Sequence, residues 1–131
     1  PYLSDKAFFI KHGYEVCDAC APNIELLVKR FRQDAPLPRF KACASAGLGD
    51  DVKGIDIFYT VQCPFTMPYI KLLEPVIQAA SVPVRVHPIT TREMAREHRA
   101  PHTTYCVFVD GKFYTREVLT PAKLQKLLEK Q

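Results

Sequence analysis

The chain has 131 residues, 47% of them hydrophobic and 24% charged, a composition that allows one ordinary domain or a small domain with an attached segment. No apolar run approaches the ~20 residues that a membrane-spanning helix requires, and no secretory signal sequence is visible. The net charge of +4 comes from basic residues interspersed with acidic ones, which is weak evidence for nucleic-acid binding.

The first third of the chain predicts a short helix followed by two short strands. Ser4 can cap a helix that ends at Lys11, and Gly13 follows where a left-handed residue is favoured. The strands are expected at 14–17 and 24–31. Residues 34–54 contain two prolines and three glycines without an apolar period, and they predict a linker.

A hairpin of this size is marginally stable alone in water. Residues 4–31 carry apolar side chains that need cover. We therefore expect this segment to pack on the rest of the chain or on a second copy, as in a homodimer.

From residue 55 the pattern changes to alternating strands and helices. The expected strands are 55–60, 84–89, 104–109 and 112–118, and the expected helices are 67–81, 91–99 and 121–130. Thr91 and Thr120 can cap the last two helices, and Asp110-Gly111 is typical of a type I′ hairpin turn. The order β-α-β-α-β-β-α predicts a mixed α/β (α+β) domain over residues 55–131.

The tetrapeptide Cys63-Pro64-Phe65-Thr66 follows the first of these strands directly. It places a thiol where a strand gives way to a helix, so that free backbone N–H groups and the helix dipole can stabilise a thiolate. Residues 56–66 (DIFYTVQCPFT) resemble the opening of a glutaredoxin or another thioredoxin-like domain. The usual second cysteine of that motif is Thr66 here, so the motif cannot shuttle a disulfide by itself.

Residues 6–16 (KAFFIKHGYEV) resemble a segment near the end of GNAT-family N-acetyltransferases, and residues 24–31 (IELLVKRF) are similar to the final strand of that family. With these two segments, PRFK at 38–41 and QCPFT at 62–66 give the chain a resemblance to the C-terminal part of a GNAT protein that carries a YoaP-like, thioredoxin-like module. The resemblance implies a GNAT remnant at 1–33, a linker at 34–54 and the module at 55–131.

The same resemblance implies acetyl-CoA as the acetyl donor of a longer parent protein. GNAT domains bind its pyrophosphate on a glycine-rich loop at a helix start, and this chain has no such loop. Phe9 stands where the family usually has a tyrosine as general acid, and a phenyl ring cannot donate a proton. The chain alone is therefore expected to be inactive as an acetyltransferase.

Cys63 is the candidate nucleophile, and it is either a reactive thiol or a small structural residue. The loop before the third strand of the module is expected to approach it, with His102 as a base or an imidazolium partner. Thioredoxin-like domains usually have a cis-proline where this chain has Thr103. Thr66, Thr103 and Thr104 are the candidate substrate-binding residues.

The odd number of cysteines, their irregular spacing and the lack of a visible secretion signal indicate a reduced, cytoplasmic protein. Cys17 and Cys20 form a C-x-x-C pair, which can indicate zinc or redox chemistry. No second pair follows at the usual spacing, so we favour two ordinary cysteines and expect no metal site.

These patterns predict the C-terminal portion of a GNAT-type acetyltransferase whose module recognises an amine or thiol-bearing substrate. The alternative is a one-cysteine thiol oxidoreductase in which Cys63 forms a mixed disulfide with glutathione or a protein. A third hypothesis is a pure interaction module in which Cys63 is inert.

Overall fold

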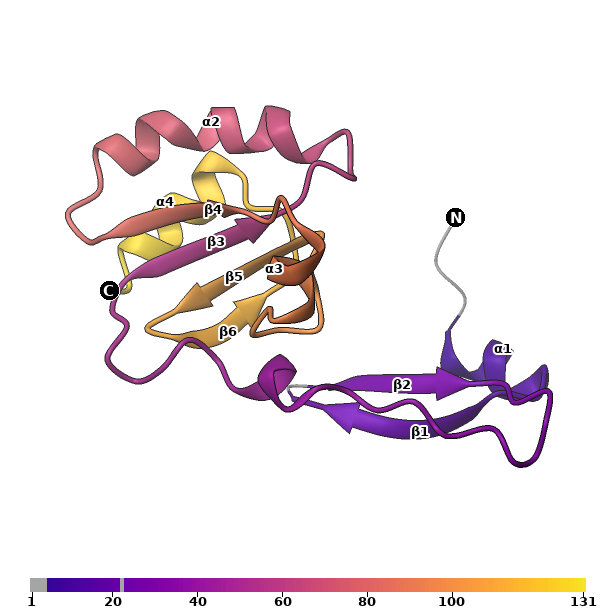
Figure 1. Cartoon of the computed structure of the whole chain (residues 1–131). Helices are drawn as coiled ribbons and strands as arrows, with labels where there is room; N and C mark the ends of the chain where they lie inside the picture. The colour runs from indigo at the N-terminus through magenta and orange to yellow at the C-terminus, as the bar shows by residue number, and fades with distance from the viewer. Residues whose placement is uncertain (1–4, 22) are drawn as a thin grey trace.

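The computed structural model describes residues 5–21 and 23–131. It has a mixed α/β architecture with two sheets, one of two strands near the N-terminus and one of four strands in the rest of the chain. Figure 1 shows the two-stranded sheet lying apart from the four-stranded one, with a long connection between them. No helix in the described residues is long and apolar enough to span a bilayer.

The N-terminal unit consists of α1 (Lys6–Lys11), β1 (Glu15–Cys20) and β2 (Ile24–Val28). The Asp5 carboxylate caps α1 by accepting a hydrogen bond from the backbone N–H of Phe8 at 3.2 Å. The expected cap, Ser4, lies outside the described residues. The two strands pair antiparallel, so the predicted order of this unit is confirmed, although β1 is longer and β2 shorter than expected.

After the linker, seven elements follow in the predicted order. They are β3 (Ile55–Tyr59), α2 (Thr66–Gln78), β4 (Val84–Pro88), α3 (Arg92–Arg96), β5 (Tyr105–Val109), β6 (Lys112–Thr115) and α4 (Pro121–Leu128). The sheet order is β4-β3-β5-β6, in which β3 and β4 are parallel and the other two pairs are antiparallel. The two inner strands, β3 and β5, are thus each paired on both edges.

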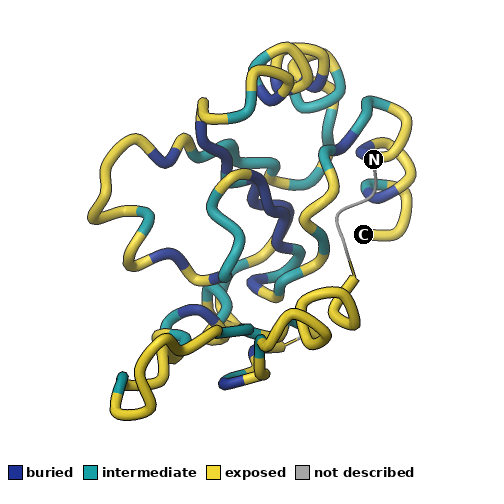
Figure 2. The backbone as a smooth tube through the Cα atoms, turned by 90° about the vertical axis from the view of Figure 1, so that its right-hand side faces the viewer, coloured by how far each residue is buried: buried dark blue, intermediate teal, exposed yellow. Residues whose placement is uncertain are grey.

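Apolar side chains alternate along the strands and form one cluster on each face of the sheet. Ile55, Ile57 and Val107 point toward α2 and α4 and join the larger cluster with Leu73 and Leu124. Figure 1 shows α2 and α4 on this side of the sheet and α3 on the other. In Figure 2 the buried residues are concentrated in the sheet, whereas the hairpin is largely exposed.

The second face carries a smaller cluster of Ala100, Cys106 and Phe108. This cluster explains why α3 ends at Arg96 rather than at residue 99 as predicted. His98 and Ala100 are both buried, and the chain must leave the helix to place them against the sheet.

Capping and turn residues in the sequence correctly predicted several ends of the helices and strands. Thr91 and Thr120 cap α3 and α4, and each hydroxyl accepts a hydrogen bond from the N–H three residues later. Asp110 and Gly111 form the β5–β6 turn with φ of 47° and 74°, as a type I′ turn requires. α2 begins at Thr66, and Pro68 is tolerated because the first turn of a helix needs no N–H from it.

The predicted linker is docked rather than loose. It contains the short 3-10 helix η1 (Ala42–Ser45), and the N–H of Leu48 donates to the carbonyl of Gly111 at 2.8 Å. Asp110 also pairs with Gly54, since its backbone N–H donates to the Gly54 carbonyl and its carboxylate accepts from the Gly54 N–H, both at 2.9 Å. We call this the linker–turn contact (residues 47–54 against Asp110 and Gly111).

The linker also forms hydrogen bonds with the β1–β2 hairpin. The Asp18 carboxylate accepts a hydrogen bond from the N–H of Phe40 at 2.8 Å, and Cys20 Sγ lies 3.5 Å from the Ala44 carbonyl oxygen. No described residue of α1 is buried, and Phe8 is 48% exposed. The structure therefore does not place α1 on the four-stranded sheet, and packing on a second copy stays a prediction.

A test of the linker–turn contact is the substitution Gly111→Ala. A Cβ at this position would run into the carbonyl of Gly49, and the residue has positive φ, so both overpacking and strain should follow. We expect a loss of about 2–4 kcal/mol in the free energy of unfolding, measured by urea denaturation.

The matched control is Gly13→Ala, which has φ of 84° but whose Cβ would meet only the Lys29 side chain at 3.7 Å. It should cost about 1–2 kcal/mol, from strain alone. Equal losses in the two variants would contradict a close contact at Gly111.

Candidate functional site

The Cys63 turn joins β3 to α2. Cys63 is half-buried, and its carbonyl accepts a hydrogen bond from the N–H of Thr66, the first residue of α2, at 3.1 Å. Val61 and Phe65 on either side of it are about 70% exposed, at 71% and 70%. The thiol therefore lies in an apolar, accessible surface at the start of a helix.

Two threonines of this region have buried hydroxyls without a partner. Thr66 is fully buried and Thr60 is 7% exposed, and neither Oγ1 has a hydrogen-bond partner among the described residues. No side chain of the described residues forms a hydrogen bond with Cys63 Sγ either. Buried hydroxyls are usually satisfied, so these two are unusual features of the turn.

The loop before β5 meets this turn through its backbone. The N–H of Thr60 donates to the carbonyl of Thr104 at 3.0 Å. Thr104 is exposed and Thr103 is half-buried. The loop therefore contacts the residue that follows β3, whereas its expected approach to Cys63 and the roles of both threonines in substrate binding stay predictions.

His102 lies elsewhere. Its ring is 5.9 Å from that of Phe113, beside the smaller cluster on the sheet face opposite α2. Burial and the nearby positive charge of Arg116 lower the pKa of His102, which favours the neutral imidazole. No described contact joins His102 to Cys63, so the structure does not assemble the two predicted catalytic residues into a pair.

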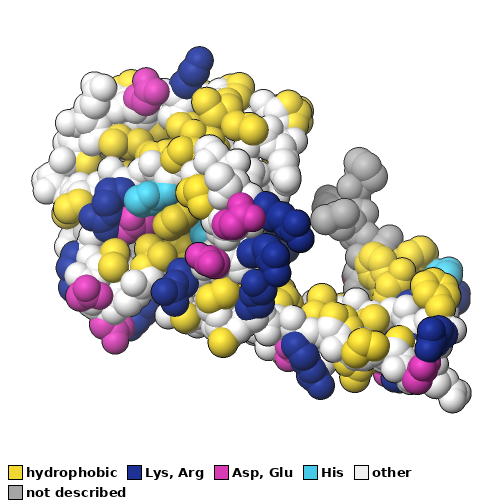
Figure 3. Space-filling model, in the orientation of Figure 1, with side chains coloured by type: hydrophobic (Ala, Val, Ile, Leu, Met, Phe, Trp, Pro, Cys, Tyr) yellow, Lys and Arg dark blue, Asp and Glu magenta, His cyan; other side chains and the backbone are white. Residues whose placement is uncertain are grey.

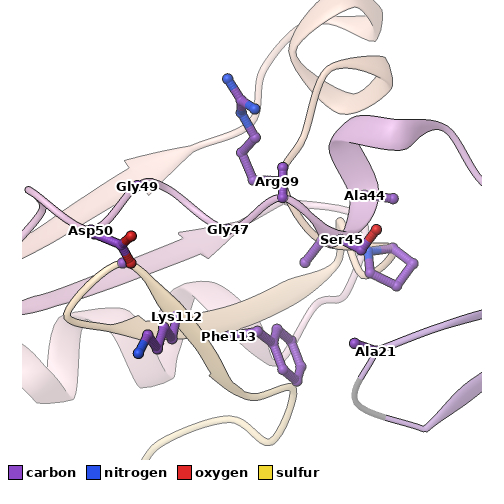
Figure 4. A pocket seen from close by; sticks show the side chains of 13 residues that line it. Ala21, Ala44, Ser45, Gly47, Gly49, Asp50, Arg99, Lys112 and Phe113 are labelled. Carbon is purple, nitrogen blue, oxygen red and sulfur yellow. The ribbon is translucent and has the colours of Figure 1, made fainter.

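His102 instead lines a cavity of about 430 Å³ between the start of β2 and β6, together with Phe113 and Arg116. A second cavity of about 360 Å³ lies on another side of Phe113. The hairpin, the linker, the loop at 99–101 and the β5–β6 turn all line this second cavity, which we call the junction cavity (Figure 4).

A buried carboxylate on the inner strand β3 was not recognised in the sequence. Asp56 is 3% exposed and accepts two hydrogen bonds from Arg85, at 2.7 and 2.6 Å. His87 Nε2 lies 2.7 Å from the same carboxylate, and its ring stacks on Phe58 at 4.4 Å. The signal was present, since Asp56 interrupts an apolar strand and Arg85 and His87 alternate on the neighbouring strand.

Burial raises the pKa of Asp56, but hydrogen bonds from Arg85 and His87 outweigh it, so the pKa lies below the usual value. Asp56 therefore remains a carboxylate in the folded protein. Figure 3 shows basic, acidic and histidine side chains mixed with hydrophobic ones on the visible surface. We interpret the cluster of Asp56, Arg85 and His87 as structural.

The remaining cysteines have structural surroundings. Cys106 is fully buried, burial raises its thiol pKa to about 12, and Sγ lies 3.1 Å from Nε2 of the buried His98. Cys17 and Cys20 are buried, whereas Cys43 and Cys63 are half-buried, and all five thiols are free. Within the described residues, no group of three or more His, Cys, Asp or Glu side chains could hold a metal ion.

Comparison with known proteins gives two findings. The profile of a family described as YoaP-like matches residues 83–126. Over 128 residues the chain is 36% identical to a Bacillus subtilis (strain 168) protein named "Uncharacterized N-acetyltransferase YoaP". These findings support a YoaP-like family.

The alignment covers 98% of this chain but 51% of the relative, so the chain spans about half the length of the curated relative it matches. No solved structure matches the chain.

The Asp56 cluster predicts how stability depends on pH. Because the pKa of Asp56 is lowered by folding, its ion pairs add stability above the unfolded value of about 3.9, and this is lost as the pH falls through the folded pKa. Asp56→Asn should lower the free energy of unfolding by about 1–3 kcal/mol near neutral pH. Urea denaturation at several pH values should show the two proteins converging in acid.

The control is Asp34→Asn, which removes an exposed ion pair with Arg32 and should leave the unfolding free energy unchanged. A difference between Asp56→Asn and the parent that persists undiminished in acid would contradict the assignment.

Proposed function

We propose that the chain is part of a longer N-acetyltransferase that transfers an acetyl group from acetyl-CoA to an amine. The observation that carries this proposal is the similarity over 98% of the chain to a protein named as an N-acetyltransferase. In this reaction the amine nitrogen bonds to the acetyl carbonyl carbon, the C–S bond breaks, CoA leaves as a thiol, and the amine gives up a proton.

Within that longer protein, residues 55–131 would form a thioredoxin-like module. The sheet order β4-β3-β5-β6, with one parallel pair and two antiparallel pairs, supports this reading, as does a cysteine at the junction of β3 and α2. Residues 1–33 would be the end of a GNAT domain. Support comes from the helix, Gly13 and the two antiparallel strands at the expected places.

The module would recognise the substrate or a partner rather than carry out acetyl transfer. Cys63 and His102 have no described contact with each other, and His102 instead lines a cavity beside the hairpin. This separation favours recognition over thiol catalysis by the pair. The acetyl-CoA site would lie outside these 131 residues, in the part of the longer protein that corresponds to the unaligned half of the relative.

The first test concerns acetyl-CoA. Because the chain has no glycine-rich phosphate loop, isothermal titration calorimetry should detect no binding of acetyl-CoA to the 131-residue chain. A longer protein that also contains a segment corresponding to the other half of the Bacillus relative should bind acetyl-CoA and acetylate an amine. Micromolar binding by the 131-residue chain, or no binding by the longer protein, would overturn this division of roles.

The alternative function is a one-cysteine oxidoreductase, which has in its favour the partial exposure of Cys63 at the start of α2. Alkylation by iodoacetamide at neutral pH, followed by mass spectrometry, compares the cysteines directly. Cys63 and Cys43 are half-buried and should react, while the buried Cys106, whose thiol pKa is about 12, should remain unmodified in the folded protein.

The comparison of Cys63 with Cys43 decides between the two functions. The recognition role predicts similar rates at both thiols. A rate at Cys63 at least ten times that at Cys43, together with a stable mixed disulfide with glutathione, would favour the oxidoreductase.

A further inference from the structure

The junction cavity combines segments that are distant in the sequence. Its walls come from the end of the hairpin, the residues around η1, the loop before β5 and the β5–β6 turn. At about 360 Å³ it can enclose a small molecule. The linker–turn contact fixes two of these walls, because it joins residues 47–54 to Asp110 and Gly111.

One end of the cavity is lined by charged side chains that have no ion-pair partner among the described residues. Asp50 and Lys112 both line this end and lie on the same side of the cavity in Figure 4, and neither side chain has an ion pair or a hydrogen bond among the described residues. The backbone N–H groups of Gly47, Gly49 and Asp50 also have no partner in the described part of the chain. Such groups bind a carboxylate, with Lys112 as the counter-charge, while the Asp50 carboxylate suits an ammonium group.

The remainder of the cavity is mostly apolar. Phe113 lines it together with Ala44, Ala100 and Pro101. In Figure 4 Phe113 lies between Lys112 and Ser45. The Arg99 side chain extends away from the cavity in Figure 4. An apolar side chain of a ligand can therefore contact Phe113 while its charged end lies near Asp50 and Lys112.

We propose that the junction cavity binds the amine acceptor, and that this acceptor is a small amino acid with a free carboxylate and an apolar side chain. The identification of the ligand as the acceptor rests on the proposed acetyltransferase function. The binding itself depends only on the charges and the shape of the cavity.

The test uses L-phenylalanine as the probe and ¹⁵N–¹H NMR of the 131-residue chain. Amide signals of residues 47–50 and 111–113 should shift in a saturable way. Phenethylamine lacks the carboxylate and should bind at least fivefold more weakly. Shifts that do not saturate, or equal binding of the two molecules, would overturn the proposal.

Variants assign the two charges separately. Lys112→Gln should weaken phenylalanine binding at least fivefold. Asp50→Asn should weaken phenylalanine binding but leave that of N-acetylphenylalanine unchanged, because the acetylated molecule has no ammonium group. Loss of both affinities to the same extent in Asp50→Asn would contradict an ammonium contact.

Matched controls separate these effects from general disturbance. Lys71→Gln removes an exposed positive charge on α2 that does not line the cavity, and it should bind phenylalanine normally. Ala46→Leu should fill the cavity and abolish binding, whereas Ala79→Leu at the C-cap of α2, also at an exposed alanine, should not. Normal binding by Ala46→Leu would place the ligand elsewhere.

The two proposals can fail independently. If phenylalanine binds here but the longer protein transfers no acetyl group, the acetyltransferase function is wrong and the site remains. If the longer protein acetylates amines but the Lys112→Gln variant of that protein shows an unchanged KM for amino acids, the site is wrong and the function remains.

Discussion

The contact between the linker and the β5–β6 turn determines how the two parts of this protein are connected. Gly111 lies so close to the carbonyl group of Gly49 that there is no room for a side chain at residue 111. Asp110 adds two hydrogen bonds to Gly54. A segment whose composition indicates a flexible connection is held against the sheet by these backbone interactions, and it in turn holds the hairpin through Asp18 and Phe40.

Much of the four-stranded domain follows from local signals. The apolar periods predicted all seven elements in order, and the threonine caps and the Asp110-Gly111 turn set several of their ends. The end of α3 was misplaced because His98 and Ala100 are buried by contacts with distant strands. A pattern within one helix carries no information about such contacts, so helix ends are the least predictable part of the fold.

The candidate site was less predictable than the fold. The sequence predicted that the loop before β5 approaches Cys63, and the structure shows this loop in contact with Thr60 at the end of β3, where the antiparallel pairing of β3 and β5 brings the two ends together. It could not show which face of the sheet His102 would lie on, and the ring packs near Phe113 rather than at Cys63. The junction cavity was not foreseen at all, since its walls meet only after the linker has docked.

The linker–turn contact also has a consequence for the order of events in folding. It joins Gly54 and Asp110, which are 56 residues apart in the chain, so it requires the closure of a long loop. The β5–β6 hairpin is local and can form quickly, and the linker has no surface to dock on until that turn exists. Docking of the linker is therefore a late step, and the β1–β2 hairpin acquires a fixed position only after the four-stranded sheet has folded.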